Sequence, residues 1–259
     1  MALPANVVHH PQSSGPAWHA LRKGRIGASS MGKCIGVSEY VDPYSEFGHI
    51  LRKADGRSLP GEFDYTNESI QHGITAEPLI CDLFARITGL DLKPGGIYTS
   101  TDGFCASPDR LVYHYDILVA TLEVKAPRSL YNTSVLPLEH LIQAQAQAQM
   151  AGLKRAYYAY AQLPVGGPYP AELPLDTPMQ IWAIDWPFDW MTNYVWPRLF
   201  QFQEKLSHPE TWPTYINGRA NRVPRVSLWT SDLPRSGINK TLVYTTQPYG
   251  RMPLRQFRI

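Results

Sequence analysis

The sequence predicts an α/β fold in which a central mixed β-sheet is flanked by helices. Residues 117–126 form an apolar, β-branched segment typical of a strand, and residues 180–185 form another. Residues 68–89 and 137–152 instead have the spacing or composition of helices. With 259 residues, of which 44% are hydrophobic, the chain can bury one substantial α/β core.

The first long helix is expected over residues 68–89. Its apolar residues recur near helical spacing, and Gly89 is a suitable stop; they are Ile70, Ile74, Ile80, Leu83, Phe84 and Ile87. Glu77 lies on this stripe, so a helix points its carboxylate toward the core, where it needs a cation or hydrogen-bond donors. Pro78 favours a kink or a helix start nearby, and the alternative is a partly exposed Glu77 beside that kink.

The strand expected over residues 117–126 ends in a charged pair. Side chains alternate across a strand, so Glu123 and Lys125 share one face, while Leu122 and Val124 share the opposite, apolar face. Asp109 precedes a shorter strand at 111–113, and a turn at 114–116 folds that strand back. The carboxylates of Asp109 and Glu123 can then converge beside Lys125.

These residues form the motif Ser107-Pro108-Asp109, followed fourteen residues after Asp109 by Glu123-Val124-Lys125. Two carboxylates beside a lysine suit Mg²⁺ or Mn²⁺, with the Val124 carbonyl as a further ligand. Such an ion polarises a phosphate, lowers the pKa of a bound water and holds the leaving oxygen, while Lys125 orients the attacking hydroxide. The motif therefore predicts phosphodiester hydrolysis; the alternative is an ordinary exposed Glu/Lys pair on an edge strand.

A second long helix is expected over residues 137–152, although its glutamines and alanines alternate with a period of two. Alanine and glutamine favour helices, Pro137 can open the first turn and Gly152 can close the last. Helical spacing places Gln143 and Gln147 on one side, and Gln145 and Gln149 on a neighbouring side. Their amides can bind a phosphate or a metal-bound water; the alternative is a solvated polar face.

Further along, residues 163–178 contain many prolines and glycines and are expected to form a long loop before the strand at 180–185. Residues 188–206 predict an aromatic-rich amphipathic helix, whose apolar positions include Trp190, Tyr194, Leu199 and Phe202. Core packing or a subunit interface explains these residues better than a cofactor site does.

The order of these motifs resembles the restriction-endonuclease-like superfamily, and more closely its lambda exonuclease (YqaJ) family of phage recombination nucleases. Three segments carry the closer similarity. They are a W-x-x-x-R…A-S element in residues 18–29, a G-x-x-x-E…F-x-x-x-T-G helix in residues 73–89 and a C-A-S-P-D turn in residues 105–109. The resemblance extends from about residue 18 to about residue 160.

The resemblance implies roles for individual residues. Asp109, Glu123 and the Val124 carbonyl are expected to hold metal, and Lys125 to be the water-orienting base or electrostatic partner. Glu77 is expected to support a second metal ion or its waters. Gln147 matches the family's active-site glutamine, with Gln145 as the alternative register. A pocket for a 5′-terminal phosphate is expected from Arg22, Ser29 and Ser107, whose guanidinium and hydroxyl donors suit phosphate oxygens.

The resemblance also implies an activity and partners. The expected enzyme uses two Mg²⁺ ions, with Mn²⁺ as a substitute, to degrade one strand of linear double-stranded DNA from a 5′-phosphate end in the 5′→3′ direction. It is expected to release mononucleotides, to encircle DNA as a homotrimeric ring and to work with a single-strand annealing protein. The alternatives are an endonuclease of the same fold, restriction or junction-resolving, and a non-catalytic DNA-binding module.

Residues 27–34 nearly match the nucleotide-binding pattern G-x-x-x-x-G-K-[ST]. Cys34 stands where that pattern needs a magnesium-ligating hydroxyl, and no hydrophobic strand precedes the segment. ATP binding is therefore not expected. The three cysteines lack metal-site spacing and are expected to be reduced and partly buried. No apolar run or leader suggests a membrane or export, so we expect a cytoplasmic protein in a bacterial host or phage-infected cell.

The formal net charge of +2 hides an asymmetry. Residues 213–259 contain a single acid, Asp232, and eight basic residues, which gives this segment +7 and the remainder −5. We therefore expect a nuclease domain at 1–212 and a basic extension at 213–259. The extension could track DNA through phosphate neutralisation, wrap a neighbouring subunit or contact a recombination partner.

Overall fold

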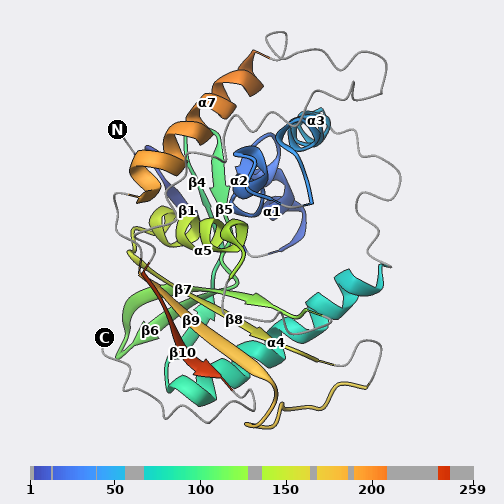
Figure 1. Cartoon of the computed structure of the whole chain (residues 1–259), viewed down its shortest axis with the longest axis vertical. Coiled ribbons are helices and arrows are strands. Elements are labelled where there is room, and N and C mark those ends of the chain that lie inside the picture. The colour runs from blue at the N-terminus through green and yellow to red at the C-terminus, as the bar shows by residue number, and fades with distance from the viewer. Residues whose placement is uncertain are drawn as a thin grey trace.

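The computed structural model contains two mixed β-sheets with helices around and between them (Figure 1). This arrangement confirms the α/β fold, but the strands divide between two sheets where one central sheet was expected. The structure describes residues 3–12, 14–38, 40–55, 67–127, 136–163, 168–185, 190–208 and 239–245.

The larger sheet has six strands in the order β10-β9-β8-β7-β6-β3. Its strands are β3 (Asp91–Pro94), β6 (Arg110–His114), β7 (Ile117–Lys125), β8 (Arg155–Ala161), β9 (Met179–Asp185) and β10 (Asn239–Thr245). Neighbours run antiparallel except β7 and β8, which are parallel. The strands expected at 111–113, 117–126 and 180–185 are therefore confirmed as β6, β7 and β9.

A tight turn joins β6 to β7 at the expected place. His114 pairs with Ile117, and the two residues between them, Tyr115 and Asp116, have φ values of 49° and 62°. Positive φ at both central residues is the turn geometry that matches the twist of paired strands. The hairpin places Arg110 opposite Leu122, so the residue before β6, Asp109, reaches the end of β7 that carries Glu123.

The smaller sheet has the order β1-β4-β5-β2. Its strands are β1 (Val8–His10), β4 (Ile97–Thr99), β5 (Phe104–Ala106) and β2 (Ile26–Gly27), with β2 parallel to β5. Three helices accompany it, namely α1 (Gly15–Arg22), α2 (Ala28–Cys34) and α3 (Pro43–Ala54). Figure 1 shows this group on one side of the central helix α5 (Leu138–Met150) and the larger sheet on the other.

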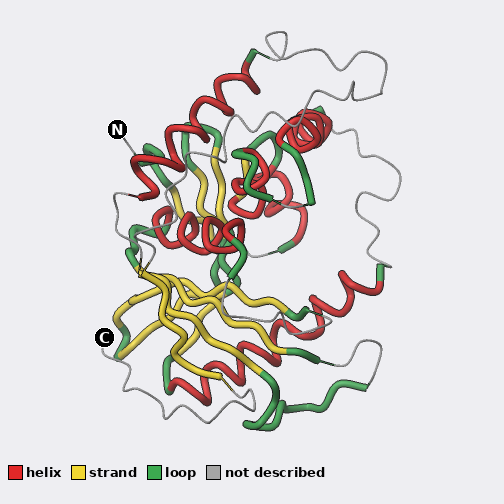
Figure 2. Tube along the Cα trace, viewed as in Figure 1, coloured by secondary structure: helices red, strands yellow, loops and turns green. Residues whose placement is uncertain are grey.

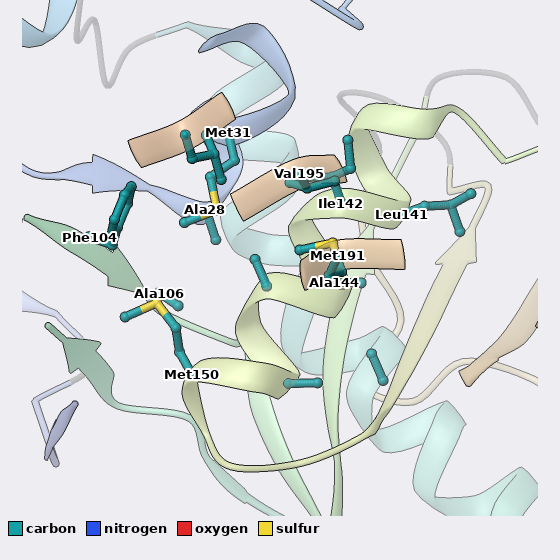
Figure 3. Packing of buried hydrophobic residues seen from close by; sticks show 14 of the residues in the cluster. Ala28, Met31, Phe104, Ala106, Leu141, Ile142, Ala144, Met150, Met191 and Val195 are labelled. Carbon is teal, nitrogen blue, oxygen red and sulfur yellow. The ribbon is translucent and has the colours of Figure 1, made fainter. Parts of the chain in front are cut away.

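The near-match to a nucleotide-binding loop has a packing explanation. Gly27 ends β2 and α2 follows directly, while Gly32 lies inside α2. A Cβ at Gly32 would lie 2.7 Å from the Glu139 Cβ of α5, so glycine lets the two helices approach closely. Met31 and Ala28 of α2 pack with Ile142 of α5 in the same buried cluster (Figure 3).

The helix α4 (Glu68–Thr88) confirms the first expected helix and covers one face of the larger sheet (Figure 2). It continues through Pro78 and ends at Gly89, whose φ of 70° is left-handed. Its buried apolar side is shorter than expected, because Ile70 and Ile74 are 38% and 54% exposed. Only the C-terminal part of the predicted stripe packs on the sheet, through Ile80, Leu83 and Phe84.

Helix α5 covers the opposite face and confirms the helix expected over 137–152, with Pro137 as its N-cap. A solvated polar face is excluded, because all four glutamines are buried. Two of them have structural partners: Gln145 donates to the Lys154 carbonyl at 3.1 Å, and Gln149 accepts from the Trp196 indole at 2.6 Å. The remaining two, Gln143 and Gln147, face β7 and are described with the site.

The chain after β8 follows the predicted order. The described part of the loop at 163–178 leads into β9, and the aromatic segment forms a π-helical turn (Met191–Val195) followed by α7 (Trp196–Ser207). Trp190, Leu199 and Phe202 are buried in the cluster around α5, which indicates core packing. No helix among the described residues is long and apolar enough to cross a bilayer.

Part of the basic extension belongs to the larger sheet. Strand β10 pairs antiparallel with β9 and forms one edge of that sheet. The other residues of 213–259 lie outside the described part of the chain. The three cysteines are unpaired, and all are buried where only partial burial was expected.

Candidate functional site

Asp109 is fixed against the last residues of β7. Its backbone N–H donates to the Leu122 carbonyl at 3.1 Å, and its Oδ2 accepts from the Val124 N–H at 2.7 Å. The N–H and C=O of one strand residue point to the same side, so the Val124 carbonyl also faces Asp109. Burial and the nearby Glu123 carboxylate raise the pKa of Asp109 well above its ordinary value.

Glu123 is the buried centre of the site. Its side chain is only 2% exposed, and three donors surround the carboxylate. Lys125 Nζ and Gln143 Nε2 donate to Oε1, the latter at 2.5 Å, and Gln147 Nε2 donates to Oε2 at 2.7 Å. A buried carboxylate needs this compensation, because it has lost its hydration shell. Leu122 and Val124 lie on the opposite, α4-covered face, as predicted.

Lys125 connects this buried centre to solvent. Its side chain is 37% exposed, whereas that of its partner Glu123 is almost fully covered. Burial by itself would lower the pKa of Lys125, but the carboxylates of Glu123, Asp109 and Glu77 together raise it. Lys125 is therefore a cation that reaches from the carboxylate centre toward the surface.

Two glutamines of α5 contact Glu123, and only one of them is in the predicted set. Gln147 contacts Glu123, whereas the alternative Gln145 points to Lys154. Gln143 contacts Glu123 as well, and it was missing from the predicted site residues. The signal was present in the sequence, because helical spacing already placed Gln143 on the same side as Gln147.

His140 and Tyr158 lie beside this centre. Tyr158 is opposite Glu123 in the parallel β7–β8 ladder, and its ring stacks on His140 with centroids 5.6 Å apart. His140 Nδ1 lies 2.9 Å from the Tyr158 hydroxyl. Burial, together with the positive charge of Lys125, lowers the pKa of His140 to about 4, so its ring is neutral at pH 7.

Glu77 was expected to point its carboxylate toward the core, but it does not. Its side chain is 37% exposed, and Arg110 Nη1 lies 2.7 Å from its Oε1. The partly exposed alternative therefore holds, although α4 shows no helix start at Pro78. A cation does face Glu77, as a carboxylate near the core requires, but that cation is a guanidinium from β6.

The residues around Asp109 fit one hard divalent cation. Asp109 and Glu123 offer carboxylate oxygens and Val124 a carbonyl, which are the ligand types that Mg²⁺ and Mn²⁺ prefer. Gln147 Oε1 is buried without a hydrogen-bond partner among the described residues, so it could bind a metal-bound water. Among the described residues, no group of three or more His, Cys, Asp or Glu side chains could hold a metal, so the backbone carbonyl and waters would have to complete the shell.

A second polar group adjoins the carboxylates. The Arg22 guanidinium lies over the Trp18 ring, 4.2 Å from its centroid, and Trp18 Nε1 donates to Ser107 Oγ at 3.1 Å. A Cβ at Gly27 would lie 3.5 Å from Arg22 Nη2 and 3.9 Å from Ser29 Oγ. The three predicted phosphate-pocket residues are therefore gathered around Trp18 and Gly27.

Trp18 is a further site residue that the predicted set omitted. It lies four positions before Arg22 on α1, and this spacing brings the Arg22 guanidinium over its ring. This cluster joins the carboxylate centre through the backbone, because Gln147 Nε2 also donates to the Ser107 carbonyl at 3.2 Å. A bound phosphate and a metal ion would therefore be close neighbours.

A family comparison agrees with this arrangement. The model of the YqaJ-like viral recombinase domain matches residues 17–154. The chain belongs to this YqaJ-like family. Every proposed site residue of the YqaJ-like domain lies within the matched region, from Trp18 to Gln147, and the basic extension lies beyond it.

Solved structures support the fold of this YqaJ-like protein. The alkaline exonuclease LHK-Exo from Laribacter hongkongensis superimposes with a TM-score of 0.57 at 18% identity, covering 74% of this chain and 93% of that one. LHK-Exo in complex with dAMP gives a TM-score of 0.57 at 20% identity with the same coverage. A search of curated proteins finds no significant match.

Proposed function

We propose that this protein is a Mg²⁺-dependent 5′→3′ exonuclease that degrades one strand of linear double-stranded DNA. One observation carries the proposal: the Asp109–Glu123–Lys125 centre adjoins a cluster of polar side chains, Arg22, Ser29 and Ser107, that could bind a phosphate. A hydrolytic centre beside a phosphate site suits an enzyme that measures its cut from a 5′ end. Family membership and the likeness to an alkaline exonuclease fold support the assignment.

Asp109, Glu123 and the Val124 carbonyl would hold the divalent ion, with Mn²⁺ as a substitute for Mg²⁺. When bound, the ion supplies a Lewis acid that polarises the scissile phosphate and makes a bound water more acidic. Gln143 and Gln147 hold the Glu123 carboxylate in one orientation through their amide donors. Glutamine suits this role because a neutral amide does not add charge to the site.

Lys125 would orient the attacking water and offset negative charge on the phosphate. The water oxygen bonds to phosphorus and releases a proton to solvent while the P–O3′ bond breaks, and the leaving 3′ oxygen takes a proton from solvent. The products are a mononucleotide with a 3′-hydroxyl and a DNA strand with a new 5′-phosphate. That phosphate can enter the Arg22 pocket, so each cut regenerates the end that the next cycle needs.

The biological setting is inferred from the family. Removal of the 5′ strand leaves a 3′ single strand, which is the substrate of an annealing protein, so we propose a role in annealing-type recombination in the cytoplasm of a bacterial host or phage-infected cell. We also propose a homotrimeric ring around the duplex, with a mass near three times 29.2 kDa. Light scattering that gives a strict monomer at working concentration would contradict the ring.

The test compares three matched duplexes with Mg²⁺: linear with 5′-phosphate, linear with 5′-hydroxyl, and covalently closed circular. The proposal expects rapid loss of the 5′-phosphorylated linear strand, slower loss of the hydroxyl form and an intact circle. Cutting of the circle would instead identify an endonuclease. Absence of cleavage on all three would favour a DNA-binding module.

A further inference from the structure

Arg110 occupies the position at Glu77 where a second metal ion was expected. It follows Asp109 directly and opens β6, opposite Leu122, whose side chain packs against α4. Cross-strand neighbours share a face, so Arg110 leaves the sheet on the α4 side and reaches Glu77. Its Nη1 lies 2.7 Å from Glu77 Oε1 and 2.6 Å from the Asp109 carbonyl.

This contact changes the chemistry available to Glu77. A carboxylate that already accepts a hydrogen bond from a guanidinium is neutralised at short range and is a poorer ligand for a metal. Arginine keeps its charge at all physiological pH values, so the neutralisation is permanent. An ion bound at Glu77 would have to displace Arg110 or approach it against charge repulsion.

The net charge around Asp109 also favours a single metal ion. Three carboxylates, of Glu77, Asp109 and Glu123, face two cations, Lys125 and Arg110. A carboxylate must be ionised to bind a metal, and with all five groups ionised the set carries one net negative charge. One divalent ion changes this to one positive charge, which suits an incoming phosphate, whereas two ions would give three positive charges beside a guanidinium.

We propose that Arg110 takes the place of a second metal ion, so that each chain binds one divalent ion and uses the guanidinium as its second cation. The inference rests on the proposed nuclease function and revises its expected two-ion requirement. The Arg110 side chain is one-quarter exposed. Among the described residues it makes two hydrogen bonds, to Glu77 and to the Asp109 carbonyl, and Nη1 is the donor in both. Its other N–H groups can therefore bind a phosphate oxygen, and Glu77 is a positioning residue that orients the guanidinium.

The test counts Mn²⁺ ions per chain by isothermal titration calorimetry and by electron paramagnetic resonance of free Mn²⁺. Wild type should bind one ion. Arg110→Ala should bind two, because Glu77 is released, and the double variant Arg110→Ala/Glu77→Gln should return to one. Glu77→Gln and Arg110→Lys should each stay at one. Arg86→Ala is the matched control, since Arg86 pairs with Asp82 on the same helix and should leave the count unchanged.

Two ions in wild type would overturn the proposal, and so would a single ion in Arg110→Ala. Both readouts are independent of cleavage, so they separate this inference from the proposed function. If the wild-type protein cleaves linear DNA and binds two ions, the proposed function stands and this inference is wrong. One ion in wild type and two in Arg110→Ala would support the inference even if no duplex is cut.

Discussion

Gln147 of the central helix α5 is hydrogen-bonded to Glu123 of β7, because its Nε2 lies 2.7 Å from Glu123 Oε2. The same nitrogen reaches the Ser107 carbonyl at 3.2 Å, so one amide joins α5, β7 and the turn that carries Asp109. The orientation of Glu123 thus depends on the packing of α5 between the sheets.

We expect Gln147→Leu to lower apparent Mn²⁺ affinity and cleavage by roughly 10–100-fold, because partners of metal ligands contribute on that scale. Gln145→Leu is the control, since Gln145 is equally buried on α5 but donates to Lys154. Both variants should lose stability. Equal losses of metal affinity in the two would show that Gln147 acts only through packing.

Lys125→Ala should reduce cleavage by at least about 100-fold, as removal of a group that stabilises transition-state charge does. End binding, measured by fluorescence anisotropy in Ca²⁺, should change little, because Lys125 acts on the reacting phosphate. Lys93→Ala, an exposed lysine on β3, should keep normal turnover. Turnover near the wild-type rate in Lys125→Ala would remove this residue from the mechanism.

Arg22→Ala should slow digestion of 5′-phosphorylated ends by roughly 10-fold or more and of 5′-hydroxyl ends far less, since charge-assisted contacts to phosphate contribute about 1.5–3 kcal/mol. Trp18→Phe should have a smaller effect, because it removes the N–H that binds Ser107 but retains a ring under Arg22. Arg25 Nη1 donates a hydrogen bond to the Leu21 carbonyl, so Arg25→Ala removes a nearby arginine with a different partner and serves as the control. Equal losses on both ends would exclude a phosphate pocket at Arg22.

His140 should make the metal-free protein less stable in acid. Its pKa is about 4 when folded and near 6.5 when unfolded, so the unfolded chain binds more protons between these values. The free energy of unfolding should therefore fall as pH drops from about 6.5 to 4, by up to about 3 kcal/mol from this residue. Urea titrations at pH 7 and 4.5 should show a smaller drop in His140→Gln; an equal drop would assign the effect to other groups.

The basic extension should contribute to DNA affinity through charge. Strand β10 is part of the larger sheet, so the test leaves its residues unchanged. The variant changes only the last basic residues, Arg251, Arg255 and Arg258, to glutamine. If all three contact phosphates, the slope of log K against log salt should shrink by about 2.7. An unchanged slope would leave subunit wrapping or a recombination partner as the role of this segment.

Local sequence patterns determined the elements and much of the site. Alternation along β7 put Glu123 and Lys125 on one face, and helix-favouring composition identified α5 despite its period of two. These predictions succeeded because they depend on geometry within one element. The motif order alone also led to the family that the domain comparison establishes.

Tertiary packing decided which of these residues meet. The exposure of Ile70 and Ile74, the use of Gly32 for helix contact and the division into two sheets depend on neighbours far along the chain. So does the pairing of Glu77 with Arg110, since the two are 33 positions apart and belong to different elements. Spacing cannot say which cation faces a carboxylate, because that contact exists only once α4 has packed on the sheet.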